Sequence, residues 1–322
     1  MARLRAAAFA ALALLAVPAR ASFFPSSPFS EKAAGTTAAP FLKNPPSAHA
    51  DALGGAYSSV VEGSEALFWN PAGMAAQEES LKSDAVIGYD ALLANSYLGS
   101  LGFSRPLPGW GVLGAGLLYG SQSSQQGYNA VGDPTSSFTP ADLAASLGFA
   151  SRIDWVRVGG AVKIIHSRVG DASGTTFAAD LGAQFPGAVA TAEGPIDLAL
   201  AVANLGPAMS IASGSDPLPF RAQIGARWHI TEVITAMLDN VMVSDQDAFS
   251  PALGMQARFP VGQDIFADGR LGYSVAHARG IDGLTGLAAG FGLEWAGLRL
   301  DYAWVPYGDL GMTNRVSLGF AW

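Results

Sequence analysis

The stretch Phe220-Arg221-Ala222-Gln223-Ile224-Gly225-Ala226-Arg227-Trp228-His229-Ile230 alternates between apolar side chains and Arg, Gln, Gly or His. Successive side chains of a β-strand point to opposite faces, so this period of two predicts a strand with one apolar and one polar face. The stretch also has about the ten residues that a tilted strand needs to cross a bilayer. It therefore predicts a membrane-crossing strand.

The same alternation recurs along the chain. We expect strands near residues 81–91, 95–105, 110–121, 139–152, 155–168, 174–186, 194–205, 219–230, 232–243, 249–260, 264–275, 283–295, 297–305 and 312–322. Fourteen is an even number, as expected for a closed barrel of one chain. The sequence therefore predicts an all-β fold, a transmembrane antiparallel β-barrel of about 14 strands over residues 81–322.

The connections between these segments support a closed barrel with two different ends. Barrels of this class have short periplasmic turns and longer external loops. The expected short turns are 106–109, 152–154, 231–232 and 296–297, and the expected long loops are 121–138, 205–219 and 306–311. With a periplasmic N-terminus the short turns fall on the periplasmic side and the long loops outside, apart from a short external turn near Leu93-Ala94-Asn95.

Composition points the same way. Charged residues make up 14% of the chain, well below the roughly 25% usual for a soluble domain, and glycine is abundant at 39 of 322 residues. Small residues such as Ala199, Ala201 and Ala203 fill the polar face of several segments, which suits a barrel lumen with bulkier side chains turned toward lipid. The net charge of -8 argues against a nucleic-acid partner.

Residues 1–21 are expected to be a signal peptide. Arg3 and Arg5 precede an apolar stretch from Ala6 to Val17, and Ala19-Arg20-Ala21 is a small-x-small cleavage site. An uncleaved membrane anchor is the alternative, but the stretch is shorter than the roughly 20 residues of a spanning helix. Together with the barrel pattern, the signal peptide predicts the bacterial outer membrane as the location.

Residues 22–80 do not alternate, and they are rich in Pro, Ala and Gly. Their Leu, Phe and Trp side chains would be poorly solvated in a free tail, so we expect an N-terminal hatch segment packed inside the barrel. At the other end of the sequence, a terminal strand finishes on an aromatic residue, as in the insertion signal that outer-membrane assembly machinery reads. Its apolar positions are Val316, Leu318, Phe320 and Trp322.

Several segments resemble the outer-membrane proteins of the PorV/PorQ family. They are Gly35–Leu42, Leu53–Ala56, the motif Leu67, Phe68, Trp69, Asn70, Pro71, Ala72 and Gly73, and the closing Leu300–Gly311. The resemblance implies a role in type IX secretion, with binding of the C-terminal domains of secreted cargo or of translocon components. The Asn-Pro-Ala part is also similar to the broader FadL-like superfamily, which implies a fourteen-stranded barrel with a hatch.

Catalytic and cofactor motifs are not supported. Gly109-Trp110-Gly111-Val112-Leu113-Gly114 matches the dinucleotide-binding glycine pattern in letters, but it opens a strand instead of a helix. The four histidines lie in separate segments without metal-ligand spacing. We therefore expect a non-enzyme without metal or cofactor.

A set of charged residues is expected to lie near the periplasmic ends of the strands, facing the lumen. This charged belt consists of Arg157, Asp197, Arg227, Arg258, Asp268, Glu294 and Arg299. Charges in a dry lumen need partners, which cross-strand pairing would provide. The belt is expected either to seal the barrel through salt bridges or to latch the hatch through Asp51, Glu62 or Glu65.

Three functions remain open from the sequence. The family resemblance favours a barrel that binds and shuttles secreted proteins for type IX secretion or surface attachment. The alternative is a FadL-like transporter that carries a hydrophobic ligand across the outer membrane. A structural porin-like barrel without a specific cargo is the third, and outer-membrane lipid is an expected partner of the barrel in each case.

Overall fold

The computed structural model describes residues 23–43, 45–129, 131–247 and 249–322. The signal-peptide prediction lies outside these residues. The barrel strands are β1 Asp84–Ala91, β2 Tyr97–Leu107, β3 Gly111–Ser121, β4 Ala141–Ile153, β5 Val156–Val169, β6 Ala172–Ala190, β7 Pro195–Leu205, β10 Arg221–His229, β11 Ile234–Val243, β12 Pro251–Gly262, β13 Ile265–Ser274, β14 Leu287–Trp295, β15 Leu298–Pro306 and β16 Met312–Ala321. A small hairpin is formed by β8 Met209–Ile211 and β9 Gly214–Asp216. The helices are η1 Glu31–Ala33, η2 Pro40–Leu42, α2 Ala48–Ala52, η3 Gly63–Glu65, α3 Ala66–Trp69, η4 Pro71–Ala76, α4 Gln77–Ser80, η5 Leu93–Asn95, α5 Val275–Ala278 and η6 Gly308–Leu310.

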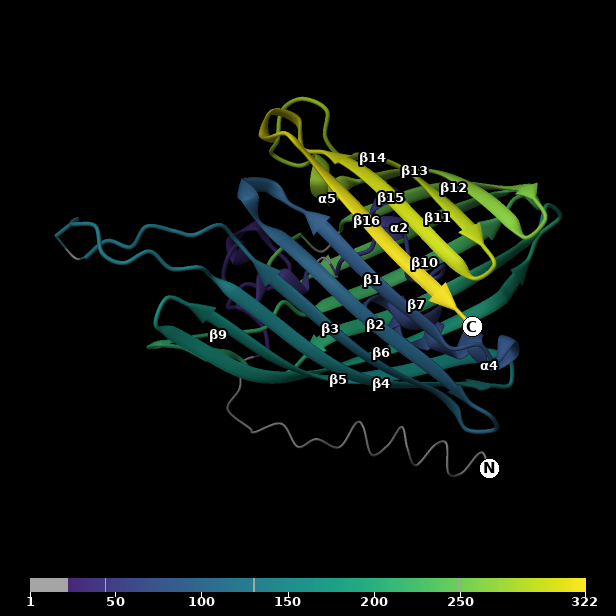
Figure 1. The fold of residues 1–322 in the computed structure, drawn as a ribbon, viewed down its shortest axis with the longest axis horizontal. Helices are drawn as coiled ribbons and strands as arrows, with labels where there is room; N and C mark the ends of the chain where they lie inside the picture. The colour runs from purple at the N-terminus through teal and green to yellow at the C-terminus, as the bar shows by residue number, and fades with distance from the viewer. Residues whose placement is uncertain (1–22, 44, 130, 248) are drawn as a thin grey trace.

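Fourteen antiparallel strands close into one barrel (Figure 1). Each strand pairs with its sequence neighbour in the barrel, and β1 pairs with both β2 and β16 to close the sheet. At the seam Ile87 lies opposite Leu318, and Asp84 lies opposite Ala321. All strand edges are therefore paired, which removes the exposed edges that an open sheet would leave.

The prediction of a closed barrel of fourteen strands is confirmed. The loop expected at 205–219 holds the β8–β9 hairpin in addition, because local pairing of Met209 with Asp216 satisfies its backbone. The strand expected from residue 283 begins only at Leu287, since Gly283 and Gly286 have φ angles of +91° and +75° and keep the chain in a turn. Within the described part of the chain, no helix has the length and hydropathy needed to cross a membrane.

The two ends of the barrel differ as the sequence predicts. At the end where β1 begins and β16 ends, here the short-turn end, each connection spans at most the four residues 191–194. At the opposite, long-loop end lie the connections 122–140, 206–220 and 275–286, together with the shorter connections 92–96, 170–171, 244–250 and 307–311. The connection 122–140 extends well beyond the strands (Figure 1).

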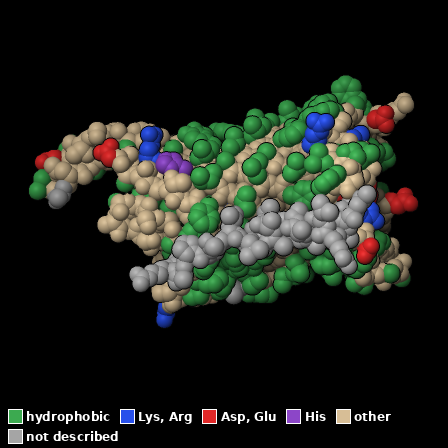
Figure 2. All heavy atoms as spheres, turned by 90° about the horizontal axis from the view of Figure 1, so that it is seen from below, with side chains coloured by type: hydrophobic (Ala, Val, Ile, Leu, Met, Phe, Trp, Pro, Cys, Tyr) green, Lys and Arg blue, Asp and Glu red, His purple; other side chains and the backbone are tan. Residues whose placement is uncertain are grey.

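The outer face of the wall is apolar, and the inner face is small or polar. Leu147, Ile164 and Leu271 are 65%, 57% and 64% exposed on the outside, whereas the intervening Ser146 and Arg270 are buried on the inside. Figure 2 shows hydrophobic side chains spread over the wall, with charged side chains gathered toward the two ends. Trp110, Trp155 and Trp295 are also exposed and lie next to short turns, as in the aromatic girdles of membrane barrels.

Residues 23–80 are here called the N-terminal segment, and its part from residue 45 to residue 76 lies inside the barrel (Figure 1). Glycines of the wall make room for them. A Cβ at Gly159 would overlap the backbone of Pro71, one at Gly116 would lie 2.6 Å from the Phe68 ring, and one at Gly290 would lie 2.5 Å from the Ala52 side chain. The small-residue face of the strands is thus the surface on which the N-terminal segment packs.

Candidate functional site

The main lumen cavity lies in the short-turn half of the barrel. Its volume is about 390 Å³, and both the N-terminal segment and strands β10 to β16 line it. From the N-terminal segment come His49, Tyr57, Val60, Glu62 and Glu65. Charged or polar side chains predominate among the wall residues, so this cavity is a polar vestibule.

Five members of the charged belt line this vestibule: Arg227, Arg258, Asp268, Glu294 and Arg299. Arg258 joins three strands, with its guanidinium 3.3 Å from Asp268 and 2.6 Å from Glu294. Arg227 lies 2.6 Å from Asp197, which also receives a contact from His229. These pairs tie neighbouring strands to one another.

Arg299 does not pair with Glu294, although the two residues are opposite in register. Its guanidinium instead lies 2.6 Å from Asp84 at the start of β1. The other oxygen of Asp84 accepts hydrogen bonds from the backbone N–H and the hydroxyl of Ser64, at 2.8 and 2.5 Å. The belt is therefore linked to the N-terminal segment through Asp84, which the sequence analysis did not single out.

Of the three expected latch carboxylates, Glu62 meets the belt, with one oxygen 2.8 Å from Arg157. Asp51 forms its ion pair with Arg315 of β16, outside the belt. Glu65 accepts the hydroxyl of Tyr57 at 2.6 Å. Burial raises the pKa of the Glu65 carboxyl to about 7, while the hydrogen bond from Tyr57 opposes this shift.

A second wall carboxylate holds the N-terminal segment farther along its length. Asp239 of β11 accepts hydrogen bonds from the backbone N–H groups of Tyr57 and Ser58, at 3.2 and 2.9 Å. Gln184 of β6 donates to the carbonyls of Ser58 and Val61, at 3.1 and 3.0 Å. Residues 57–64 are therefore clamped to the wall at several points by charge-assisted or paired hydrogen bonds.

The motif residues Leu67, Phe68, Trp69, Asn70, Pro71, Ala72 and Gly73 are all buried, in α3 and at the start of η4. Asn70 caps η4 by accepting the Ala72 N–H at 3.2 Å, and its amide donates to the carbonyl of Ser58 at 2.9 Å. The ring of Trp69 lies under the guanidinium of Arg221, 4.6 Å from its centroid. The motif thus forms the part of the segment that packs most deeply against the wall.

A smaller cavity of about 50 Å³ lies toward the long-loop end, lined by Asp51, Gly54, Gly55, Trp69 and Arg221 among others. Between it and the vestibule lie α2 and the turn that follows it, because His49 and Tyr57 face the vestibule whereas Asp51 and Gly54 face the smaller cavity. The N-terminal segment thus separates two lumen cavities.

Arg270 and Arg315 are buried arginines that the sequence analysis missed. Arg270 lies 3.2 Å from Asp268 and 2.5 Å from Asp301, and its side chain is 3% exposed. Both arginines occupy inward positions of strands with clear alternation. The residues that follow them, Leu271 and Val316, point outward and are exposed. That alternation was the available signal for finding them.

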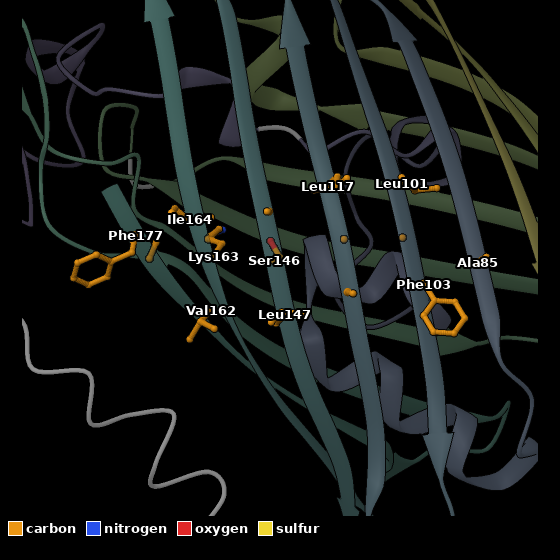
Figure 3. A pocket seen from close by; sticks show the side chains of 15 residues that line it. Ala85, Leu101, Phe103, Leu117, Ser146, Leu147, Val162, Lys163, Ile164 and Phe177 are labelled. Atoms are coloured by element: carbon orange, nitrogen blue, oxygen red, sulfur yellow. The ribbon is translucent and has the colours of Figure 1, made fainter. Parts of the chain in front are cut away.

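An apolar depression lies outside the lumen. It has a volume of about 780 Å³ and runs across the outer faces of β1 to β6 (Figure 3). Leu101, Leu147 and Ile164 line it and are exposed, while the N-terminal segment lies behind these strands. Because this face of the wall is apolar, the depression is suited to contact with lipid chains and is distinct from the lumen site.

The terminal positions Val316, Leu318 and Phe320 point outward on β16, at 43%, 43% and 46% exposure. Trp322 stacks on Phe320 with ring centroids 5.5 Å apart, and its backbone exchanges hydrogen bonds with Ser83. These residues therefore lie at the seam of the barrel. Among the residues that the structure describes, no group of three or more His, Asp or Glu side chains could hold a metal ion.

Comparisons with known proteins bear on the fold. No protein-family model and no curated protein matches the sequence. The toluene transporter TbuX of Ralstonia pickettii is similar in structure, with a TM-score of 0.56 at 12% identity over 87% of this chain and 98% of that one. The toluene transporter TodX of Pseudomonas putida gives 0.55 at 13% identity over 86% and 97%. The chain is thus similar in fold to barrels that transport a hydrocarbon.

Proposed function

We propose that this protein is a gated outer-membrane conduit for small hydrophobic molecules, with the N-terminal segment as its hatch. The observation that carries the proposal is the separation of two lumen cavities by α2 and residues 53–57. A small molecule can then pass along the lumen only when the hatch moves, and the closed wall of the barrel need not change. The fold likeness to two toluene transporters supports the substrate class.

An aromatic cluster at the long-loop end supports a hydrophobic substrate. Phe24, Phe29 and Phe220 contact one another with ring centroids 5.2 to 6.2 Å apart, and Phe24 is 39% exposed. Met209 and Leu218 are buried in the same connection that leads into β10. An apolar entrance of this kind would favour an apolar solute over a sugar or an ion.

The test is uptake of labelled toluene by intact cells that carry the protein in their outer membrane. The chain has no cysteine, so a double variant Ala52→Cys/Ala303→Cys can join α2 to β15, whose alanines pack together. We expect uptake when the pair is reduced and a loss of uptake when it is oxidised. The single-cysteine variants serve as controls. Uptake equal to that of cells without the protein, or uptake indifferent to oxidation, would contradict the proposal.

A second function, the secretion shuttle implied by the PorV/PorQ resemblance, is supported by the connection between β3 and β4. Its two arms pair at Gln125 with Phe138 and at Tyr128 with Pro134, so it forms a hairpin beyond the barrel. Tyr128 and Val131 are 66% and 82% exposed at its tip. Exposed apolar side chains on a protruding hairpin suit the capture of another protein.

Native mass spectrometry of the barrel, extracted from its own outer membrane, separates the two functions. A co-purifying secreted protein that is lost when residues 124–137 are replaced by a short turn would favour the shuttle. A stoichiometric hydrophobic molecule without a protein partner would favour the conduit. A barrel with neither, and without toluene uptake, would be a porin-like barrel.

A further inference from the structure

Two carboxylates share one guanidinium in the long-loop half of the lumen. Arg315 of β16 forms an ion pair with Asp51 of α2, and its Nε lies 3.9 Å from the carboxylate of Asp90 on β1. Its remaining nitrogen donates to the hydroxyl of Tyr307 at 3.1 Å. The side chains of Arg315, Asp51 and Asp90 are 4%, 7% and 3% exposed. One carboxylate thus belongs to the N-terminal segment and the other to the wall.

The present arrangement does not use the full bonding capacity of this trio. Oδ2 of Asp51, Oδ1 of Asp90 and Nε of Arg315 have no hydrogen-bond partner among the described residues. A buried arginine left without a counter-ion is strongly unfavourable. Because Asp90 is already close to Arg315, it can take over the guanidinium after a small side-chain movement.

The helix that carries Asp51 lies between two fixed points. Before it, Lys43 and Thr37 contact Asp245, at 2.5 and 2.7 Å. After it, Asp239 holds the backbone of Tyr57 and Ser58. Residues 45–56, here called the strap, span the interval and contain α2.

The strap has few polar bonds to the wall. Beyond Asp51 with Arg315, they include His49 to Gln256 at 2.9 Å and Gln223 to the Gly55 carbonyl at 3.3 Å. Gly54 and Gly55 follow α2 with φ angles of +66° and +90°, a conformation that lets the chain turn sharply there. The strap is therefore held to the wall by one buried ion pair and a small number of hydrogen bonds.

From this geometry we propose that Arg315 exchanges partners when the hatch opens, releasing Asp51 and pairing with Asp90. Asp90 is the counter-ion of the open state, and Asp51 is the counter-ion of the closed state. The lumen keeps a paired arginine in both states, so the strap can leave without stranding a buried charge. This inference rests on the proposed hatch movement and names the residues that control it.

The two carboxylates then have opposite effects on opening. Removing the charge of Asp51 weakens the closed state and leaves Arg315 paired with Asp90, so the strap leaves more often. Removing the charge of Asp90 weakens the open state, so the strap leaves less often. A cluster that only stabilises the fold would respond to both changes in the same direction.

The experiment measures maleimide labelling of Ala52→Cys, the sole cysteine in the chain, in protein embedded in membranes. Ala52 belongs to the strap and is fully buried where the strap packs against β14 and β15. Labelling of a cysteine at this position therefore reports departure of the strap from the wall. We expect Asp51→Asn to speed labelling and Asp90→Asn to slow it, each by roughly tenfold, the factor that corresponds to about 1.4 kcal/mol in the opening equilibrium. Asp197→Asn is the matched control, because Asp197 is also a buried lumen carboxylate and its ion pairs, with Arg227 and His229, join strands of the wall to one another.

Faster labelling in both variants, or no change in either, would overturn the exchange. Folding of each variant is checked by heat-modifiable migration, and Asp90→Ser replaces Asp90→Asn if the latter does not assemble. Labelling does not depend on any solute. If the two variants change labelling in opposite directions but the cells take up no toluene, the partner exchange of Arg315 stands and the conduit function is rejected. If toluene is taken up but labelling is unchanged, the conduit function stands and the partner exchange is rejected.

Discussion

At the scale of single residues, inward glycines decide where the N-terminal segment can lie. Gly102, Gly114, Gly116 and Gly148 all leave space that Leu67, Phe68 or Met74 fills. On the opposite wall Gly254 and Gly272 receive Leu53 and the backbone that follows it. An added methyl group at such a position has no free volume to enter, because the neighbouring atoms are close-packed.

Gly159→Ala should displace the N-terminal segment. A Cβ at this position would overlap the Pro71 backbone, which cannot move aside as the end of a flexible side chain can. We expect a loss of about 1–3 kcal/mol in the free energy of unfolding, as for other overpacked sites, measured by denaturant titration in lipid vesicles. Gly269→Ala is the control, since nothing lies within 4 Å of its added Cβ. Equal stability of the two variants would contradict this packing.

The packing of the N-terminal segment should weaken as the pH rises. Burial raises the pKa of Glu65 from its ordinary 4.5 to about 7, so the folded state favours the protonated carboxyl. The stabilisation is complete below pH 4.5 and is lost as the pH rises through 7. Protease cleavage within residues 45–80 should accelerate between pH 5 and 8 in the native protein. In Glu65→Gln, cleavage should lose this component of its pH dependence; an identical profile in both proteins would exclude Glu65 as its source.

At the scale of elements, the N-terminal segment is held by unequal contacts along its length. Its middle part, residues 57–64, receives bonds from the wall carboxylates Asp84 and Asp239. The strap before it has one ion pair to the wall, between Asp51 and Arg315, and two hydrogen bonds between neutral groups. An element held in this way can open in part while the rest stays in place.

The belt arginines should affect the N-terminal segment in a definite order. Arg299→Gln leaves the buried Asp84 without its counter-ion, and Asp84 holds Ser64. Arg157→Gln removes the contact with the half-exposed Glu62 and a long hydrogen bond of 3.5 Å to Gln184, and exposed pairs contribute little. Proteolysis of the segment should therefore rise most in Arg299→Gln and slightly in Arg157→Gln.

Arg258→Gln is the comparison within the belt. Its ion pairs are with Asp268 and Glu294 of the wall, and Asp268 keeps Arg270 as a partner. We expect proteolysis of the segment at the native rate in this variant. A rate as high as that of Arg299→Gln would mean that the belt acts on the segment as a unit.

The last strand should influence assembly more than stability. Trp322 contacts Phe320 and Phe103 at the seam between β16 and its neighbours. Trp322→Ala should lower the amount of heat-modifiable barrel in the outer-membrane fraction, because the terminal aromatic is expected to be part of the insertion signal. Purified variant that is refolded in detergent should retain the native melting temperature. If the amount of assembled barrel and the melting temperature of the refolded variant both fall, the variant is defective in stability and not in assembly alone.

At the scale of the whole molecule, the outer wall sets the orientation in a membrane. Its exposed Leu, Ile and Phe side chains lie between the two ends where charges gather (Figure 2). A bilayer around this band would place the short turns on one side and the long loops on the other. The lumen charges then stay inside the barrel, away from lipid.

A charge on this wall should be least tolerated near its middle. Leu147 lies within β4, and Leu147→Arg is expected to make folding into vesicles less favourable by about 2–4 kcal/mol. Ile153→Arg, at the end of the same strand, should make folding less favourable by about 0–1 kcal/mol, since arginine reaches the interface there. Equal losses would contradict the assignment of this face to lipid.

Strand number and the two faces of each strand could be predicted from the sequence. An alternating pattern places every second side chain on one face, and this is a local property of extended backbone. The segment 219–230 illustrates it, because Arg221 and Gln223 are buried while Ile224 is exposed. Even the small residues at Ala199 and Ala201 were correctly expected to face inward.

Which charges meet inside the lumen could not be predicted in full. Register does place Arg258 opposite Asp268, yet long side chains reach past their neighbours, so Arg299 pairs with Asp84 across the seam. Asp51 meets Arg315 only because a segment from the start of the chain folds back against its last strand. Sequence by itself determined the wall, since alternation is local; the closure of the barrel decided the lumen contacts, since they join residues that no local pattern relates.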